Sequence, residues 1–243
     1  MLAIFRDLFA PPRHMILLVI AVWIGLALAE KRAERHGIRK DDLNNITLYA
    51  LLAFIIGGRI SFILQNIPAF LESPLSIISI NPGIFELFGA IASAVIVLFI
   101  YRQRKNLELW SMLDALTPFF ALLAIGLGLS HLAAGTSFGK ETELPWGIEL
   151  WNATRHPTQI YAFLASLITF GLLWLKKQSP RPGILFLTFA ALTSLSQLFI
   201  EAFRADNPVI ANGFKQNQIV AWIVLALTFL LMELRIRQSK KRD

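Results

Sequence analysis

The stretch that decides the fold class of this 243-residue chain covers residues 113–134 and reads Leu-Asp-Ala-Leu-Thr-Pro-Phe-Phe-Ala-Leu-Leu-Ala-Ile-Gly-Leu-Gly-Leu-Ser-His-Leu-Ala-Ala. Asp114 and His131 are its only ionisable side chains. About 20 predominantly apolar residues in an α-helix cross the hydrocarbon core of a bilayer. The stretch therefore predicts a membrane-spanning helix.

Six further apolar runs of similar length lie on both sides, and each is bounded by charged residues or by proline and glycine. They cover residues 15–29, 46–64, 84–101, 158–175, 183–203 and 218–234. None shows the sustained two-residue alternation of a membrane barrel strand. The sequence therefore predicts an all-α polytopic membrane protein with seven transmembrane helices, in which residues 1–243 form a single transmembrane domain.

The composition agrees with a membrane protein, because 56% of the residues are hydrophobic and only 16% are charged. Soluble domains carry about 45–50% apolar and about 25% charged residues. The chain has no cysteine, which excludes disulfide frameworks, thiolate metal sites and cysteine nucleophiles. We expect neither a metal nor a cofactor.

The 23 lysines and arginines are distributed unevenly between the loops. Sixteen lie in the loops after the first, third and fifth spans and in the carboxy-terminal tail, six lie in the opposite set, and Arg59 lies inside the second span. Since cytoplasmic loops collect lysine and arginine, the amino terminus is predicted outside and the carboxy terminus in the cytoplasm. The basic surplus thus reports orientation, and no nucleic-acid partner is expected.

The first span also resembles a secretory signal peptide, with Arg6 and Arg13 before it and Ala27-Leu28-Ala29 at its end. Cleavage there would export five lysines and arginines of residues 30–45, against the charge rule. We therefore expect the span to be retained, and we expect residues 1–12 to form a short interfacial helix.

Ionisable groups inside a span are costly and are candidates for function. Arg59 follows Gly57 and Gly58, which permit close approach, and its guanidinium suits bidentate binding of a phosphate. The alternatives are an ion pair with Glu86 or a side chain that extends to the interface. Asp114 is expected to cap a helix or to pair with a cation.

His131 lies at the outer end of the fourth span and is a candidate acid or base, because its pKa range suits that role. A satisfied buried histidine is the alternative. The outer loop 135–157 contains two glycines, a Pro-Trp-Gly corner and Arg155-His156, so it is predicted to be structured. It either binds a lipid headgroup or is anchored on the bilayer by Trp146, Trp151 and Tyr161.

The sixth span ends in a polar face, because Gln197, Glu201 and Arg204 recur at i, i+4 and i+7. Glu201 and Arg204 are expected to pair. Such a stripe favours a cavity over lipid, which would leave these groups without partners.

Taken in order, these motifs resemble the prolipoprotein diacylglyceryl transferase family, which consists of seven-span bacterial inner-membrane enzymes with the orientation deduced above. The resemblance runs through most of the chain. It is carried by Gly57-Gly58-Arg59, Asp114 with Pro118, Gly135-x-x-Phe138-Gly139, Pro145-Trp146, the string Arg155-His156-Pro157-Thr158-Gln159-Ile160-Tyr161, Glu201-x-x-Arg204 and Gln218.

The resemblance implies transfer of the diacylglyceryl group of phosphatidylglycerol to the lipobox cysteine of an exported preprotein. It implies as partners the bilayer, phosphatidylglycerol or another anionic phospholipid, and a lipobox-containing preprotein. On this interpretation His131 and His156 are the catalytic candidates. The substrate-binding candidates are Gly58, Arg59, Gly135, Gly139, Arg155, Gln159, Tyr161, Glu201 and Arg204.

Several family signature positions carry other residues in this chain. Gly128 replaces an arginine, His131 and Ala134 replace two asparagines, and Thr136 replaces a glutamate. Further changes fall at Leu87, Ala162, Thr193 and Gln197. Two alternatives therefore stay open, a phospholipid-binding protein without catalysis and a transferase that uses a different acceptor.

Overall fold

The computed structural model describes residues 2–78, 85–176, 181–211 and 213–240. Over these ranges the chain is mainly α-helical, with two short antiparallel hairpins, β1–β2 and β3–β4. The helices are α1 (Leu2–Leu8), α2 (Met15–Ala33), α3 (Lys40–Gln65), α4 (Ile67–Glu72), α5 (Leu87–Lys105), α6 (Leu109–Ala134), α7 (Thr158–Leu175), α8 (Ile184–Phe203) and α9 (Gln216–Lys240), with 3-10 turns at η1 (Glu34–His36) and η2 (Pro74–Ile78). The strands are β1 (Ile148–Leu150), β2 (Ala153–Arg155), β3 (Val209–Ala211) and β4 (Phe214–Lys215).

The long helices match the predicted spans closely. Helix α7 coincides with the predicted 158–175, and α8 begins one residue after the predicted 183. Helix α3 begins at Lys40, ahead of the predicted 46. Residue 84, where the third span was predicted to begin, lies outside the described residues, and α5 begins at Leu87.

Among the described residues, α3, α5, α6, α7, α8 and α9 are long and apolar enough to cross a bilayer. The protein is therefore a multi-pass helical membrane protein. Helix α2 has 19 residues, but its last turns carry three charged side chains, Glu30, Lys31 and Arg32, and this charge separates it from the other six. Seven crossings remain a prediction.

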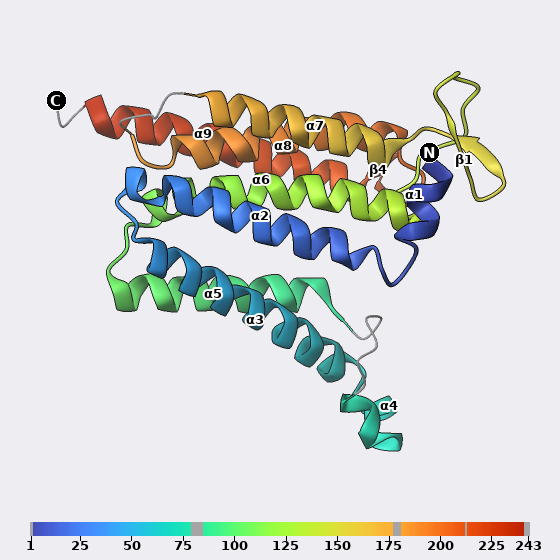
Figure 1. Cartoon of the computed structure of the whole chain (residues 1–243), viewed down its shortest axis with the longest axis horizontal. Helices are drawn as coiled ribbons and strands as arrows, with labels where there is room; N and C mark the ends of the chain where they lie inside the picture. The colour runs from blue at the N-terminus through green and yellow to red at the C-terminus, as the bar shows by residue number, and fades with distance from the viewer. Residues whose placement is uncertain (1, 79–84, 177–180, 212, 241–243) are drawn as a thin grey trace.

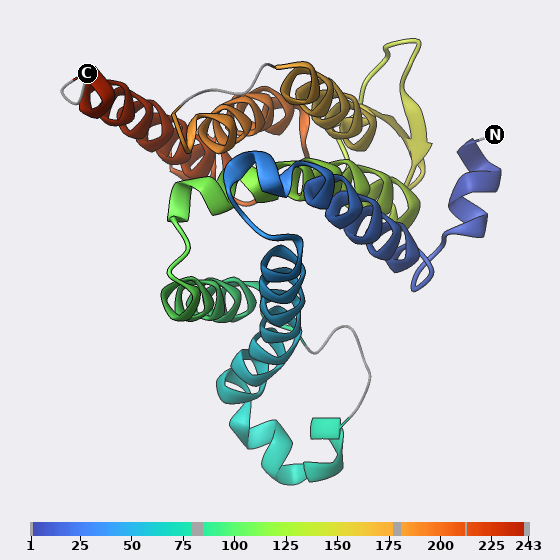
Figure 2. The ribbon, with the colours of Figure 1, turned by 60° about the vertical axis from the view of Figure 1, so that its left-hand side comes forward.

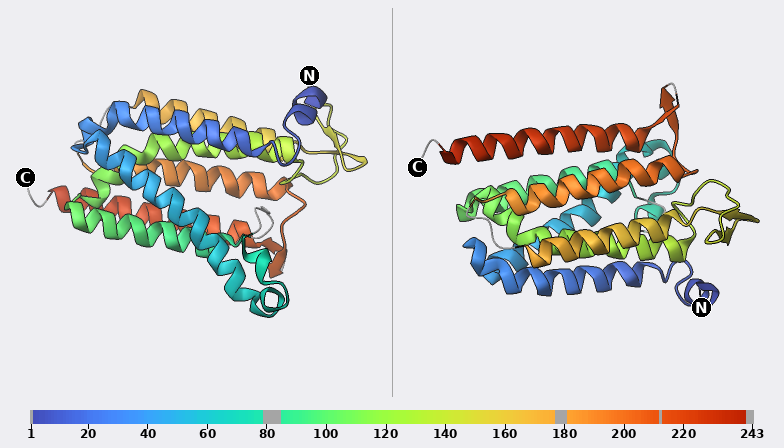
Figure 3. Two further views of the ribbon diagram at one scale, coloured as in Figure 1. Left: turned by 60° about the horizontal axis from the view of Figure 1, so that its bottom comes forward. Right: turned by 90° about the horizontal axis from the view of Figure 1, so that it is seen from above.

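The long helices run up and down along a common axis, and the two chain ends lie at opposite ends of the bundle (Figure 1). Helix α6 is the central element and packs against α2 and α7, while α8 packs against α7 and α9. Views from below and above show the same arrangement, with α9 on the far side of α8 from α6 and α2 (Figure 3). An amino terminus and a carboxy terminus at opposite ends agree with an odd number of passes.

The outer faces of these helices carry large apolar side chains that the described residues leave exposed. Trp23, Ile168 and Phe199, from three different helices, are 73%, 63% and 67% exposed. Soluble monomers rarely expose apolar patches on this scale. These faces are suited to contact with acyl chains.

Small residues allow α2 and α6 to approach each other. A Cβ on Gly126 would meet the side chain of Ala21, and one on Gly25 would lie 3.1 Å from the backbone of Phe119. Close backbone approach through small residues is the common means of helix association in membranes, where apolar burial alone supplies little driving force.

Helices α3 and α5 form a hairpin that diverges from the remaining bundle (Figure 2) and joins it at one end, where Leu43 and Tyr101 lie in a buried apolar cluster with Ala29 and Met112. Its contact surface is also built on small residues. A Cβ on Gly57 would collide with Ser93, one on Gly58 with the Phe85 ring, and one on Gly89 with Ser61. The close approach predicted at Gly57 and Gly58 is therefore made to α5.

Asp114 connects two helices at the end of the bundle opposite to α1. Its carboxylate accepts hydrogen bonds from the backbone N–H groups of Gly183 (2.7 Å) and Phe186 (2.8 Å), which lie at the start of α8. The guanidinium of Arg235 donates to the carbonyl of Pro182 at 2.9 Å. The predicted capping role of Asp114 is confirmed, but the helix that it caps is α8.

Candidate active site

The polar groups of the site gather at the end of the bundle that carries α1 and β1 (Figure 1). Helix α6 ends there at Gly135, whose φ of +69° is the left-handed conformation that closes the helix. The outer loop 136–157, the start of α7, the end of α8 and the β3–β4 hairpin meet at the same end.

Three side chains form a hydrogen-bonded chain across this end. Ser137 Oγ lies 3.1 Å from His131 Nδ1. Arg204 Nη2 donates to Ser137 Oγ at 3.0 Å. Ser137 is only 9% exposed and His131 is half-buried. The structure thus joins His131 on α6 to Arg204, directly after α8, through a serine of the outer loop.

Arg204 is held by two acids. Its Nη1 donates to Glu201 Oε1 at 2.8 Å, which confirms the expected pair, and its Nε donates to Asp206 Oδ1 at 3.0 Å. Glu201 is fully buried, and its two oxygens also accept hydrogen bonds from the amides of Asn207 and Asn217. A buried carboxylate with this many donors is a rigid support for the guanidinium.

Lys215 is buried against the carboxy-terminal end of α8. Its ammonium group donates to the backbone carbonyls of Arg204 and of Glu201 (2.6 Å), and the carbonyl of Glu201 also accepts from the backbone N–H of Arg204. Burial is the main cause that lowers the pKa of Lys215, and the positive charge of Lys140 adds to it. The lysine therefore holds the backbone at the end of α8, which carries Glu201 and Arg204.

The outer loop is joined to the end of α8 by backbone hydrogen bonds. Lys140 N donates to Phe203 O at 2.7 Å, and Ala205 N donates to Phe138 O at 2.9 Å. At Gly139 a Cβ would collide with the backbone carbonyl of His156. The two glycines of the prediction, Gly135 and Gly139, are thus positions that the backbone path requires.

Arg155 lies within the outer loop, and its guanidinium holds several loop residues together. Its guanidinium donates to Leu150 O at 3.1 Å, to Gly139 O at 3.5 Å and to Glu141 Oε1 at 3.2 Å. Its carbon Cζ lies 5.2 Å from the centre of the Phe138 ring. Its guanidinium nitrogens are therefore engaged by the loop itself.

Two polar residues at the start of α7 fix the segment that carries Ser137. Thr158 Oγ1 donates to Ser137 O at 2.6 Å, and Gln159 Nε2 donates to Thr136 O at 2.9 Å. Both side chains are about 1% exposed. The carbonyl oxygen of Gln159 has no hydrogen-bond partner among the described residues.

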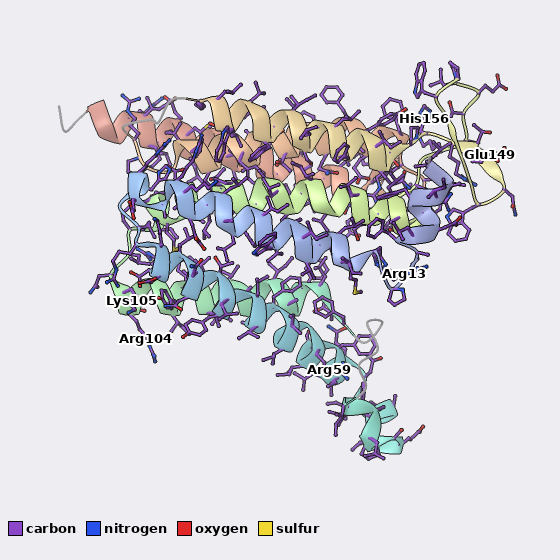
Figure 4. The ribbon with its side chains drawn as sticks, viewed as in Figure 1. Arg13, Arg59, Arg104, Lys105, Glu149 and His156 are labelled. Atoms are coloured by element: carbon purple, nitrogen blue, oxygen red, sulfur yellow. The ribbon has the colours of Figure 1, made fainter. Side chains whose placement is uncertain are left out.

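His156 belongs to an aromatic group beside the site. Its ring centre lies 4.9 Å from that of Phe203, and its Nδ1 lies 3.4 Å from Tyr161 Oη. Trp146 Nε1 donates to the same hydroxyl at 2.9 Å. Figure 4 shows His156 at the base of the outer loop, at the end of the bundle that carries the site.

Arg59 and Gly58 lie on the α3–α5 hairpin, apart from this cluster (Figure 4). Arg59 donates to Ile77 O through Nε (3.1 Å) and Nη2 (2.7 Å). The carboxylate of Glu86 instead accepts from Ser61 and caps the start of α5. The alternative of an Arg59–Glu86 ion pair is not found in the part of the chain that the structure describes.

Several residues of the cluster were not predicted from the sequence. They are Ser137, Asp206, Asn207, Lys215 and Asn217. A short polar run directly after Arg204 in an otherwise apolar chain was the available signal for Asp206 and Asn207. No group of three or more His, Asp or Glu side chains is placed to hold a metal ion within the described ranges.

With this geometry in place, comparison with known proteins gives a clear result. A family model described as prolipoprotein diacylglyceryl transferase matches residues 13–234. The chain belongs to this family. Curated relatives named phosphatidylglycerol–prolipoprotein diacylglyceryl transferase come from Clostridium tetani (28% identity, covering 78% of this chain and 79% of the relative), Desulfotalea psychrophila (28%, 92% and 88%) and Nitrosomonas europaea (27%, 94% and 86%).

Gly128 allows α6 to pack closely against α7. A Cβ on Gly128 would lie 2.9 Å from the backbone of Phe163. No larger side chain fits between the two helices at this point. The contact between α6 and α7 therefore depends on a glycine at this position.

Proposed function

We propose that the protein transfers the diacylglyceryl group of phosphatidylglycerol to the lipobox cysteine thiol of an exported preprotein, at the outer face of the bacterial inner membrane. One observation carries this proposal. Segments that match the family and lie far apart in the sequence, Glu201-x-x-Arg204 and the Arg155–Tyr161 string, meet at one end of the helical bundle.

The reaction needs cationic and hydrogen-bonding groups around a phosphate. The thiolate sulfur forms a bond to the glyceryl carbon, and the bond from that carbon to the phosphate oxygen breaks. The electron pair leaves with glycerol phosphate, and the thiol proton passes to solvent. Donors aimed at the leaving oxygen stabilise the charge that develops there.

The proposed roles follow from the contacts. Arg204, rigidly supported by Glu201, binds the lipid phosphate. His131 contacts the phosphate or acts as the base for the thiol. His156 and Tyr161 form the wall beside them.

Gln159, Gly135, Gly139 and Arg155 hold the backbone around the lipid headgroup. Arg59, with Gly58 beside it, attracts anionic lipid to the α3–α5 hairpin.

The test is complementation in bacteria depleted of their own transferase. Membranes containing this protein should carry a lipobox cysteine heavier by one diacylglyceryl group in mass spectra. Matched cells that express the Arg204→Ala variant, inserted to the same level, should lack the modification.

Two other outcomes have separate meanings. Insertion without any modified lipoprotein and without release of glycerol phosphate from phosphatidylglycerol contradicts the proposal and favours a lipid-binding protein. Release of glycerol phosphate without a modified lipobox cysteine favours a different acceptor, which the replaced signature positions Gly128 and Leu87 make the second candidate.

A further inference from the structure

We propose that Ser137 fixes the tautomer of His131, so that the ring nitrogen Nε2 carries the proton and donates a hydrogen bond to the phosphate of the lipid. The identity of the ligand rests on the proposed function. The chemistry of the ring rests on the contacts between three side chains, His131, Ser137 and Arg204. Ser137 is then a positioning residue, and His131 is the residue that touches substrate.

The hydroxyl oxygen of Ser137 accepts a hydrogen bond from Arg204. A guanidinium has only donors, so the 3.0 Å contact from Arg204 Nη2 makes Ser137 Oγ an acceptor. The hydroxyl proton of Ser137 must find another partner. Since Ser137 is 9% exposed, water is a poor substitute for a protein acceptor.

The partner for the hydroxyl proton of Ser137 is His131. Its Nδ1 lies 3.1 Å from Ser137 Oγ and is the acceptor that the described residues provide. The reverse arrangement, in which Nδ1–H donates, leaves a buried hydroxyl proton without an acceptor, and such groups are unfavourable. Nδ1 is therefore unprotonated, and the neutral ring carries its hydrogen on Nε2.

The backbone of Ser137 is held in an uncommon conformation by its neighbours. Its φ of +55° lies in the left-handed region, which is uncommon for residues other than glycine. The backbone carbonyl of Ser137 accepts from Thr158 Oγ1, and that of the preceding Thr136 accepts from Gln159 Nε2. A residue stays in such a conformation when its surroundings determine it, and here those contacts direct the hydroxyl to His131.

The consequence distinguishes two roles that were left open for His131. A neutral ring with hydrogen on Nε2 is a donor at that nitrogen, whereas a base for the thiol needs a free lone pair there. No hydrogen bond to Nε2 is found within the described residues, so this N–H is available to a ligand. His131 and Arg204 thus stabilise the leaving phosphate together, and His131 transfers no proton.

The tautomer can be measured on the resting protein without any substrate. We expect nitrogen NMR of protein labelled with 15N-histidine, in detergent at neutral pH, to show an acceptor nitrogen at Nδ1 and an N–H at Nε2 of His131. Ser137→Ala and Ser137→Gly should both produce a measurable population of the Nδ1–H form. The glycine variant removes the hydroxyl without straining the left-handed backbone.

The control is Ser196→Ala, because Ser196 donates its hydroxyl to a backbone carbonyl within α8. It should leave the signals of His131 unchanged, and the Ser137 variants should leave those of His156 unchanged. A wild-type His131 that carries its proton on Nδ1 or is doubly protonated overturns the proposal. So does an unchanged tautomer in both Ser137 variants.

Activity gives a second, independent readout. His131→Gln keeps a side-chain N–H donor but has no basic nitrogen, and we expect it to retain activity within about tenfold. His131→Phe should lose about 100–1000-fold, the usual effect of removing one donor to a developing anion. Equal losses in both variants contradict a donor role. If the wild type transfers nothing, the proposed function fails, while the NMR measurement still decides the tautomer.

Discussion

The cluster at the end of α8 and the α3–α5 hairpin each place an arginine and a glutamate in apolar helices, yet they use them differently. Arg204 contacts Glu201, Asp206 and Ser137 through its guanidinium nitrogens, and Glu201 is fully buried. Among the described residues, the guanidinium of Arg59 donates to the backbone carbonyl of Ile77 and forms no ion pair with Glu86. Of the two arginines, Arg204 is thus the stronger candidate for a site, because the tertiary structure supplies its partners.

The glycines of the two regions differ in the same way. In the hairpin, Gly57 and Gly58 face side chains of α5 and allow two helices to pack. In the loop, Gly139 faces the backbone of His156 and allows two backbone segments to lie in close contact. The four predictions below test this contrast.

The largest effect is expected on stability when the buried acid is removed. Glu201→Leu leaves Arg204 without its main partner and deprives Asn207 and Asn217 of an acceptor, so the free energy of unfolding should fall by about 3–5 kcal/mol. Thermal unfolding in detergent, followed by circular dichroism, measures the change.

The matched control is Glu233→Leu, which removes the acid of an exposed pair with Arg237 on α9. Its effect should stay within about 0.5 kcal/mol, as for other exposed pairs on helices. Equal losses for the two variants contradict the buried support described for Arg204.

The second prediction compares the two arginines in activity. Arg204→Ala should reduce the transfer rate by about 100–1000-fold, which corresponds to about 2.7–4 kcal/mol of lost stabilisation of developing charge. Arg59→Ala should cost no more than about tenfold, or about 1.4 kcal/mol, since Arg59 lies on the α3–α5 hairpin, apart from the cluster around Arg204. Initial rates with phosphatidylglycerol vesicles and a lipobox peptide decide this. A greater loss for Arg59→Ala would reverse the comparison.

The third prediction concerns the contact between α6 and α7. Gly128→Ala forces a methyl group against the backbone of Phe163 and should destabilise the protein by about 1–3 kcal/mol. Gly171→Ala is the control on α7, because nothing lies within 4 Å of its Cβ position. It should be neutral or stabilise by about 0.5–1 kcal/mol, as expected for alanine in place of a helical glycine. Melting temperatures of both variants in one detergent give the answer.

The smallest effect is expected in the hairpin. Gly57→Ala places a methyl group against both Oγ and Cβ of Ser93, and since the Cβ cannot rotate away, α3 and α5 must separate slightly, at a cost of about 1 kcal/mol. The double variant Gly57→Ala/Ser93→Gly, which removes both colliding atoms of Ser93, should recover most of the loss in unfolding experiments. If it does not, the hairpin is held by contacts other than this one.

The helices could be predicted from the sequence because apolar length determines a span, as the agreement of α7 with residues 158–175 illustrates. The pairing of Glu201 with Arg204 could also be predicted, since residues three apart face each other on a helix. Partners distant in the sequence could not. Asp114 caps a helix that begins about 70 residues later, and no periodicity reports which helices adjoin.

Ser137 shows a different limit. A single serine between glycines carries no distinguishing pattern, and its left-handed φ depends on bonds from Thr158 that only the folded chain makes. The hairpin β1–β2 is similar, because its turn uses Trp151 and Asn152 at positive φ, a conformation that tryptophan seldom adopts. In both cases tertiary contacts decide the local conformation.

The pairing of Arg204 with Asp206 has a consequence for any anion that approaches. Asp206 occupies both Nε and Nη2 of the guanidinium, whereas Glu201 occupies Nη1 from the buried side. Of the two carboxylates, Asp206 is the more exposed, with 23% of its side chain accessible against 0% for Glu201. The proposed function therefore requires an incoming phosphate to exchange with Asp206, so that binding replaces one anion at the guanidinium by another instead of adding an anion to an unpaired cation.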